Sequence, residues 1–63
     1  MGDFSAIFVK VDGTDETDLG QHFLNAETLE AAVEEAQARA PREANSIKIC
    51  REGQMIHRVM VGL

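Results

Sequence analysis

The sequence predicts a small α+β fold, in which one antiparallel sheet carries a single helix on one of its faces. Two observations predict this class. Runs rich in β-branched and aromatic residues lie at both ends of the chain, over residues 4–11, 45–51 and 54–61. Between them, residues 26–40 carry apolar side chains at helical spacing. The predicted order is therefore strand, possible short strand, helix, strand, strand, in a single domain spanning residues 1–63.

The first predicted strand covers residues 4–11 and ends at the turn signal Asp12-Gly13. Both of its faces are apolar: one carries Phe4, Ala6 and Phe8, and the other carries Ile7, Val9 and Val11. This pattern is typical of a strand covered on both sides and favours a central place in the sheet.

The middle of the chain divides into a polar stretch and a helix. Residues 12–20 combine turn formers with acidic residues and show no apolar period, which predicts an exposed loop. Residues 21–24 form either a short second strand or the lead into the helix. The helix over 26–40 can be capped by Asn25 or Thr28. Pro41 ends it, because the residue before a proline is disfavoured in helical conformation.

The last two strands should form a hairpin around Glu52-Gly53. A two-residue loop would place Ile49 opposite Ile56, and Ile47 opposite Arg58, on the face toward the helix. The other face would carry Cys50, Met55, Lys48, His57, Ser46 and Val59. Because apolar residues remain for this uncovered face, we expect a second copy to cover it, giving either a homodimer of sheets or a continuous intermolecular sheet. The candidate interface consists of Ile7, Val9, Val11, Met55, Val59 and Val61.

Charge is distributed unevenly along the chain. The formal net charge is −5, with −8 in residues 1–35 and +3 in residues 36–63. Lys48, Arg51 and Arg58 form a candidate basic patch on the hairpin, which could serve internal pairing or an acidic partner. Nucleic-acid binding is disfavoured by the overall acidity. A regulatory or antitoxin-like protein, meeting nucleic acid or a toxin through this hairpin, is the first alternative function.

The residues that could carry chemistry are few. Cys50 and His57 should share one hairpin face, so a thiol- or metal-dependent activity there is the second alternative. A buried cysteine that behaves as a small hydrophobe is the simpler interpretation. The acids of residues 12–18 lack the spacing of a calcium loop. We therefore assign no catalytic, metal or cofactor residues, and expect no enzyme activity.

The run Thr28–Ala36, following the strand-like pair His22-Phe23, resembles the strand-to-helix segment of HicB-type antitoxins. The resemblance covers roughly a quarter of the chain. The glycine and proline signature that precedes the helix in that family is absent here. The resemblance therefore carries no functional residue over to this sequence.

Location and partners follow from what the sequence contains. Residues 1–8 show neither a basic leader nor a long apolar run, so we expect no signal peptide and no membrane span. A single cysteine fits a reducing compartment, which predicts a cytoplasmic protein. Taken together, these features predict a small non-catalytic interaction module that pairs with itself through its sheet and binds a protein partner that the sequence leaves unidentified.

Overall fold

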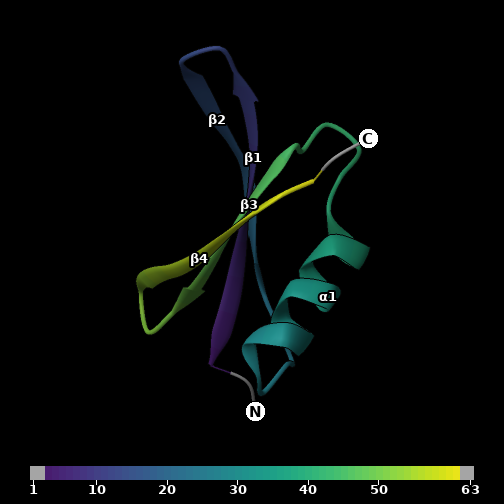
Figure 1. Cartoon of the computed structure of the whole chain (residues 1–63), viewed down its shortest axis with the longest axis vertical. Coiled ribbons are helices and arrows are strands. Elements are labelled where there is room, and N and C mark those ends of the chain that lie inside the picture. Colours follow the sequence, from purple (N-terminus) through teal and green to yellow (C-terminus); the bar gives the residue numbers. More distant parts are fainter. Residues whose placement is uncertain (1–2, 62–63) are drawn as a thin grey trace.

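The computed structural model describes residues 3–61 as a four-stranded antiparallel sheet with one helix packed against it (Figure 1). Along the chain the elements are β1 (Phe4–Asp12), β2 (Asp15–Phe23), α1 (Leu29–Arg39), β3 (Ser46–Arg51) and β4 (Gln54–Met60). Within the sheet the order is β2-β1-β3-β4. The predicted fold class is confirmed, and β1 lies inside the sheet as its two apolar faces indicated.

β2 occupies most of the region that the sequence predicted to be a loop. Asp12 pairs with Asp15, so the loop shrinks to a tight turn in which Gly13 takes a φ of 65°. Every side chain of β2 except His22 is exposed, so the strand has no buried face. The loop prediction over residues 12–20 was therefore wrong, because backbone pairing with β1 forms this strand without any apolar alternation.

A β-bulge interrupts the pairing of β1 with β2. Phe8 pairs with Gly20 and Val9 pairs with Asp18, which leaves Leu19 as the extra residue. Gly20 has a φ of 143°, a conformation that side-chain-bearing residues rarely adopt. The bulge increases the local twist of the hairpin, which extends beyond the rest of the sheet in Figure 1.

The helix begins later and ends slightly earlier than its apolar pattern suggested. Thr28 is the N-cap, and its Oγ1 accepts a hydrogen bond of 3.2 Å from the backbone N of Ala31. Ala40 is already extended ahead of Pro41, as the proline predicted. The sequence left Asn25 and Thr28 open as caps, and the structure selects Thr28.

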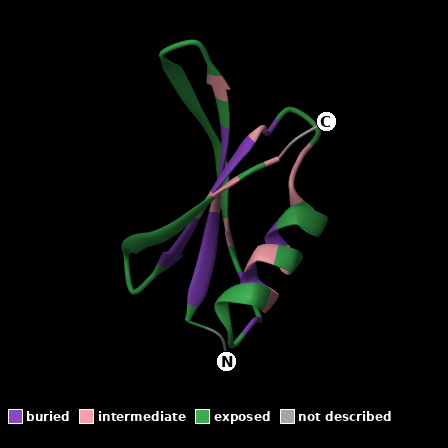
Figure 2. Cartoon of the chain, in the orientation of Figure 1, coloured by how far each residue is buried: buried purple, intermediate pink, exposed green. Residues whose placement is uncertain are grey.

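The core lies between α1 and the face of the sheet formed by β1 and β3. Ala32 and Ala36 of the helix are fully buried, and their small side chains allow the helix to approach the sheet closely. The remaining buried members of this cluster are Phe4, Ala6, Phe8, Leu24, Ala26, Ala44, Ile47 and Ile49. Figure 2 shows the buried residues concentrated on the two central strands and on the inner side of the helix.

The hairpin of β3 and β4 forms around Glu52-Gly53, whose φ angles of 53° and 82° suit the tight turn that was predicted. The predicted register was wrong beyond this turn. Ile49 lies opposite His57, and Cys50 lies opposite Met55, so Ile56 is an extra, bulged residue. One inserted residue exchanges the two faces of the rest of the strand.

Candidate interaction surface

The face of the sheet away from α1 is partly covered by a charged bridge. Oε1 of Glu16 (β2) lies 3.4 Å from Nζ of Lys48 (β3), and Oε2 of Glu16 lies 3.6 Å from Nη2 of Arg58 (β4). Arg58 also donates from Nε to Oγ of Ser46 over 2.9 Å. Ser46 and its β1 neighbour Val9 are both fully buried. Side chains of this chain therefore cover this part of the sheet.

Each of the three cations of the candidate basic patch lies close to an acidic side chain. Lys48 and Arg58 are paired with Glu16, while Nη2 of Arg51 lies 3.8 Å from Oδ2 of Asp3. The guanidinium of Arg51 also lies 5.5 Å from the centroid of the Phe4 ring. The sequence left open whether these cations serve internal pairing or an acidic partner. In the structure all three pair with acidic side chains of the same chain.

The candidate sheet interface is divided between two faces. Ile7, Val9 and Val11 lie on the face away from the helix, and the exposed Met55 lies on the same side. Val59 and Val61 instead pack against the helix-side core. The physical reason is the bulge at Ile56, which turns the following β4 residues over. These six residues cannot form one continuous surface.

The bulge also separates the two residues of the thiol or metal hypothesis. Cys50 is a buried free thiol that faces away from the helix. His57 pairs with Ile49 and lines a groove beside α1 on the opposite face. Within residues 3–61 there is no group of three His, Cys, Asp or Glu side chains placed to hold a metal ion.

The two edges of the sheet differ in chemistry. The β2 edge presents the acidic side chains Asp15, Glu16 and Asp18, which discourage pairing with another strand, and its exposed large apolar side chains are Leu19 and Phe23. On β4, Met55, Ile56 and Met60 are 54%, 46% and 64% exposed. Among the described strands, β4 therefore combines a free edge with the largest share of exposed apolar side chains. Figure 2 shows most of this strand as exposed.

Sequence reasoning missed Ile56 and Met60 as surface residues. Ile56 was assigned to the core face because a regular two-residue hairpin places it opposite Ile49. A bulge next to a tight turn has no signature in this sequence that would have indicated it, because neither residue at the bulge is glycine or proline.

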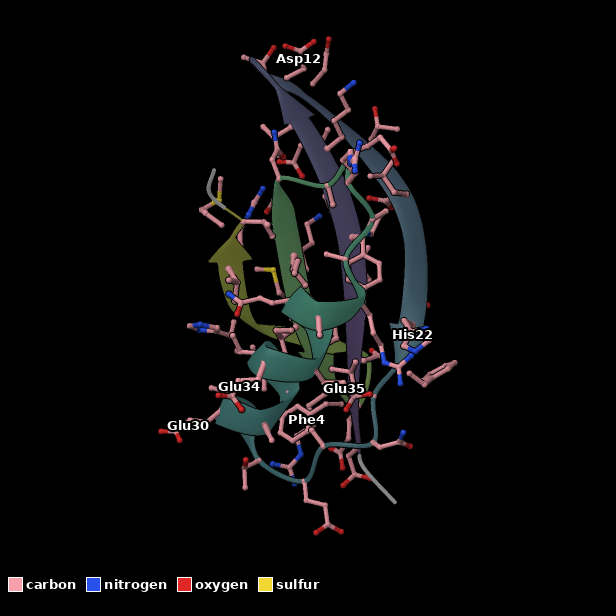
Figure 3. All side chains as sticks on the ribbon, turned by 90° about the vertical axis from the view of Figure 1, so that its right-hand side faces the viewer. Phe4, Asp12, His22, Glu30, Glu34 and Glu35 are labelled. Atoms are coloured by element: carbon pink, nitrogen blue, oxygen red, sulfur yellow. The ribbon has the colours of Figure 1, made fainter. Side chains whose placement is uncertain are left out.

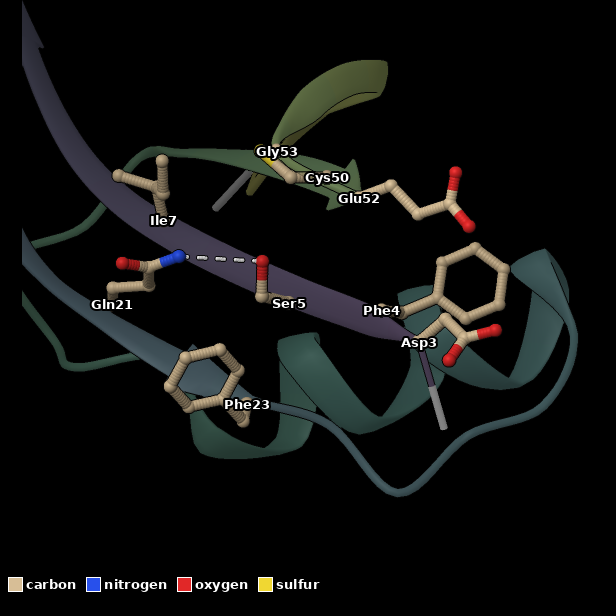
Figure 4. Close-up of a pocket in the computed structure, with 9 residues that line it drawn as sticks. All are labelled: Asp3, Phe4, Ser5, Ile7, Gln21, Phe23, Cys50, Glu52 and Gly53. Atoms are coloured by element: carbon tan, nitrogen blue, oxygen red, sulfur yellow. Dashed lines mark hydrogen bonds between the residues drawn. The ribbon is translucent and has the colours of Figure 1, made fainter. Parts of the chain in front are cut away.

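Several hollows lie outside the core of the described residues: one, of about 420 Å³, is lined by residues 40–45 and Val61 among others, and two others border the sheet. The first, of about 400 Å³, is lined by Ser5, Gln21, Phe23 and Cys50 among others, and its Phe23 ring is 79% exposed (Figure 4). Gln21 Nε2 donates to Ser5 Oγ across its floor over 3.4 Å. The hollow is bounded by charged and polar groups as well as by apolar ones. Nothing in its geometry points to a reaction.

The second hollow is a shallow groove of about 440 Å³ between α1 and β4. On the α1 side it is lined by the apolar Leu29 and Val33 and the acidic Glu30 and Glu34, and on the β4 side by His57. Figure 3 shows Glu30 and Glu34 on the flank of α1 nearer β4, with Glu35 on the other flank. The groove lies on the helix face of β4, whereas Met55 and Met60, which pair with Cys50 and Ser46, lie on the opposite face of the same edge strand.

In comparisons with known proteins, no family model, curated protein or solved structure matches this chain. Among the described residues, no helix has the length and apolarity required to cross a membrane. The features that bear on function are therefore the free edge of β4 and the groove between β4 and α1.

Proposed function

We propose that this chain is a small, non-catalytic interaction module that pairs with a second copy through the free edge of β4. The two four-stranded sheets would then form one continuous eight-stranded sheet. The observation that carries the proposal is the exposure of Met55, Ile56 and Met60 on an edge strand without a partner among the described residues. Exposed, apolar strand edges are templates for pairing with another strand.

A second copy is the partner that suits this edge best. Two identical strands can pair in antiparallel fashion around a two-fold axis, so each copy offers the other the same backbone donors and acceptors. The apolar side chains of β4 would then contact apolar side chains of β4 in the second copy. A chain of this length also has a small core, and self-association is a common way to stabilise such domains.

The area that β4 can bury determines how tightly two copies would associate. A stable interface of standard size buries about 800 Å² on each partner, roughly a sixth of the 4478 Å² exposed by this chain. A seven-residue strand provides only part of that area. The β4 contact is therefore of the smaller, weaker class, which associates in a concentration-dependent way.

The charged bridge supports edge-to-edge over face-to-face pairing. Glu16, Lys48 and Arg58 satisfy one another above Val9 and Ser46. A partner sheet stacked on this face would have to displace them or bury their charges, which is costly. Pairing in the plane of the sheet leaves the bridge intact.

Sedimentation velocity over a wide range of protein concentration tests the proposal. The wild-type chain should sediment as a dimer, and Ile56→Lys should sediment as a monomer, because a lysine on an edge strand opposes pairing. Thr17→Lys places the same charge on the β2 edge and should remain dimeric. A monomeric wild type, or equal effects of the two lysines, would overturn the proposal.

Circular dichroism of both variants should show that the fold is retained. We also propose a cytoplasmic location, because Cys50 is a buried free thiol, which suits a reducing compartment.

A further inference from the structure

We infer that a dimer joined at β4 has a trough between its two α1 helices, and that this trough binds one cationic amphipathic helix of another protein. The inference rests on the proposed dimer. The two-fold axis of an antiparallel strand pair can stand perpendicular to the sheet. Both α1 helices then lie on the same face of the joined sheet, on either side of the axis.

The width of the trough follows from the position of α1. The helix packs on β1 and β3, whose side chains dominate the core beneath it. Neighbouring strands lie about 4.8 Å apart, so two strand spacings, about 10 Å, separate the middle of β1 and β3 from the new junction. Near the two-fold axis the helix axes are therefore about 19 Å apart. Helices pack at distances of about 8–10 Å, which leaves room for one helix between them.

Apolar side chains of α1 face the trough, beside His57 of β4. The groove between α1 and β4 already exists in the single chain, with a volume of about 440 Å³. Leu29 is 37% exposed there and Val33 is half-buried. Pairing at β4 places the grooves of the two copies side by side. The apolar side chains of the two α1 helices then face the space between them and suit the apolar side of an amphipathic helix.

The walls of the trough are acidic. Glu30 and Glu34 are one helical turn apart, about 6 Å along the helix axis, and they form no ion pair with any residue in 3–61. Arg39 of α1 pairs with Glu35 on the other flank, and Arg58 of β4 pairs with Glu16 on the opposite face of the sheet. The two copies together present four carboxylates, so lysine and arginine side chains complement the walls.

A titration with a synthetic helical peptide of leucine and lysine, followed by fluorescence anisotropy and calorimetry, tests the inference. We expect one peptide to bind per two chains. The double variant Glu30→Gln/Glu34→Gln should weaken binding about tenfold or more at low salt, because each bound peptide loses four charged contacts. The matched control Asp15→Asn/Asp18→Asn removes the same number of charges from the β1–β2 hairpin. Its affinity should remain within about twofold of the wild type.

The outcomes separate this inference from the proposed function. Equal weakening by both double variants would mean non-specific attraction to an acidic protein and would overturn the trough. One peptide per chain would do the same, as would undiminished binding by monomeric Ile56→Lys. A wild-type dimer that does not bind the peptide overturns only the trough. A wild-type monomer in sedimentation overturns the dimer and the trough together.

Discussion

Asn45 lies directly before β3 and forms hydrogen bonds at the ends of β1 and β4. Replacing its side chain should therefore measurably destabilise the fold. Its side-chain Oδ1 accepts a 2.8 Å hydrogen bond from the backbone N of Val11, and its Nδ2 donates to the carbonyl oxygen of the same residue over 2.8 Å. Its own backbone N donates to the carbonyl of Val9, and its carbonyl accepts from the N of Val61. One residue thus ties the ends of β1 and β4 to the start of β3.

The change Asn45→Ala removes the two side-chain hydrogen bonds and leaves the two backbone bonds in place. At about 0.5–1.5 kcal/mol for each bond, the free energy of unfolding should fall by about 1–3 kcal/mol. The whole domain is expected to have only about 3–9 kcal/mol of stability at about 0.05–0.15 kcal/mol per residue. The variant should therefore lose a large fraction of its total stability.

Urea unfolding followed by circular dichroism measures this loss, with an unchanged slope indicating an unchanged unfolded state. Asn25→Ala is the matched control, since no hydrogen bond within the described residues uses the Asn25 side chain. Only its backbone N is held, by Glu35 at 3.0 and 3.2 Å. If Asn45→Ala unfolds within about 0.5 kcal/mol of the Asn25→Ala variant, the hydrogen-bond argument is refuted.

Two further predictions concern the bridge and the core. Glu16→Gln should lower the free energy of unfolding by about 0.5–1 kcal/mol at low salt, because Lys48 and Arg58 lose a partly exposed partner. The loss should shrink in high salt; a salt-independent loss would contradict a charge effect. Ala36→Leu should destabilise the fold by about 1–3 kcal/mol, because it overfills a fully buried site. The exposed Ala38→Leu serves as its control in the same unfolding assay, and equal stabilities would show that the helix does not pack closely on the sheet.

The sequence by itself determined the parts of the fold that have their own local signal. β1 was predicted from a run of β-branched and aromatic residues, and its two apolar faces indicated a central strand. The helix end was predicted from Pro41, which acts on the residue before it whatever the surroundings. The turn at Glu52-Gly53 was likewise visible, because glycine takes a positive φ without steric cost.

Only the tertiary structure decided the features that depend on pairing between strands. β2 has almost no buried side chains, so its existence depends on the backbone groups offered by β1 and not on a pattern of its own. The bulge at Ile56 exchanged the faces of β4, and so moved Val59 and Val61 to the core and separated Cys50 from His57. A shift of one residue reverses every side chain beyond it, because side chains alternate along a strand. For the same reason the surface that we propose for self-association could be located only after the register was known.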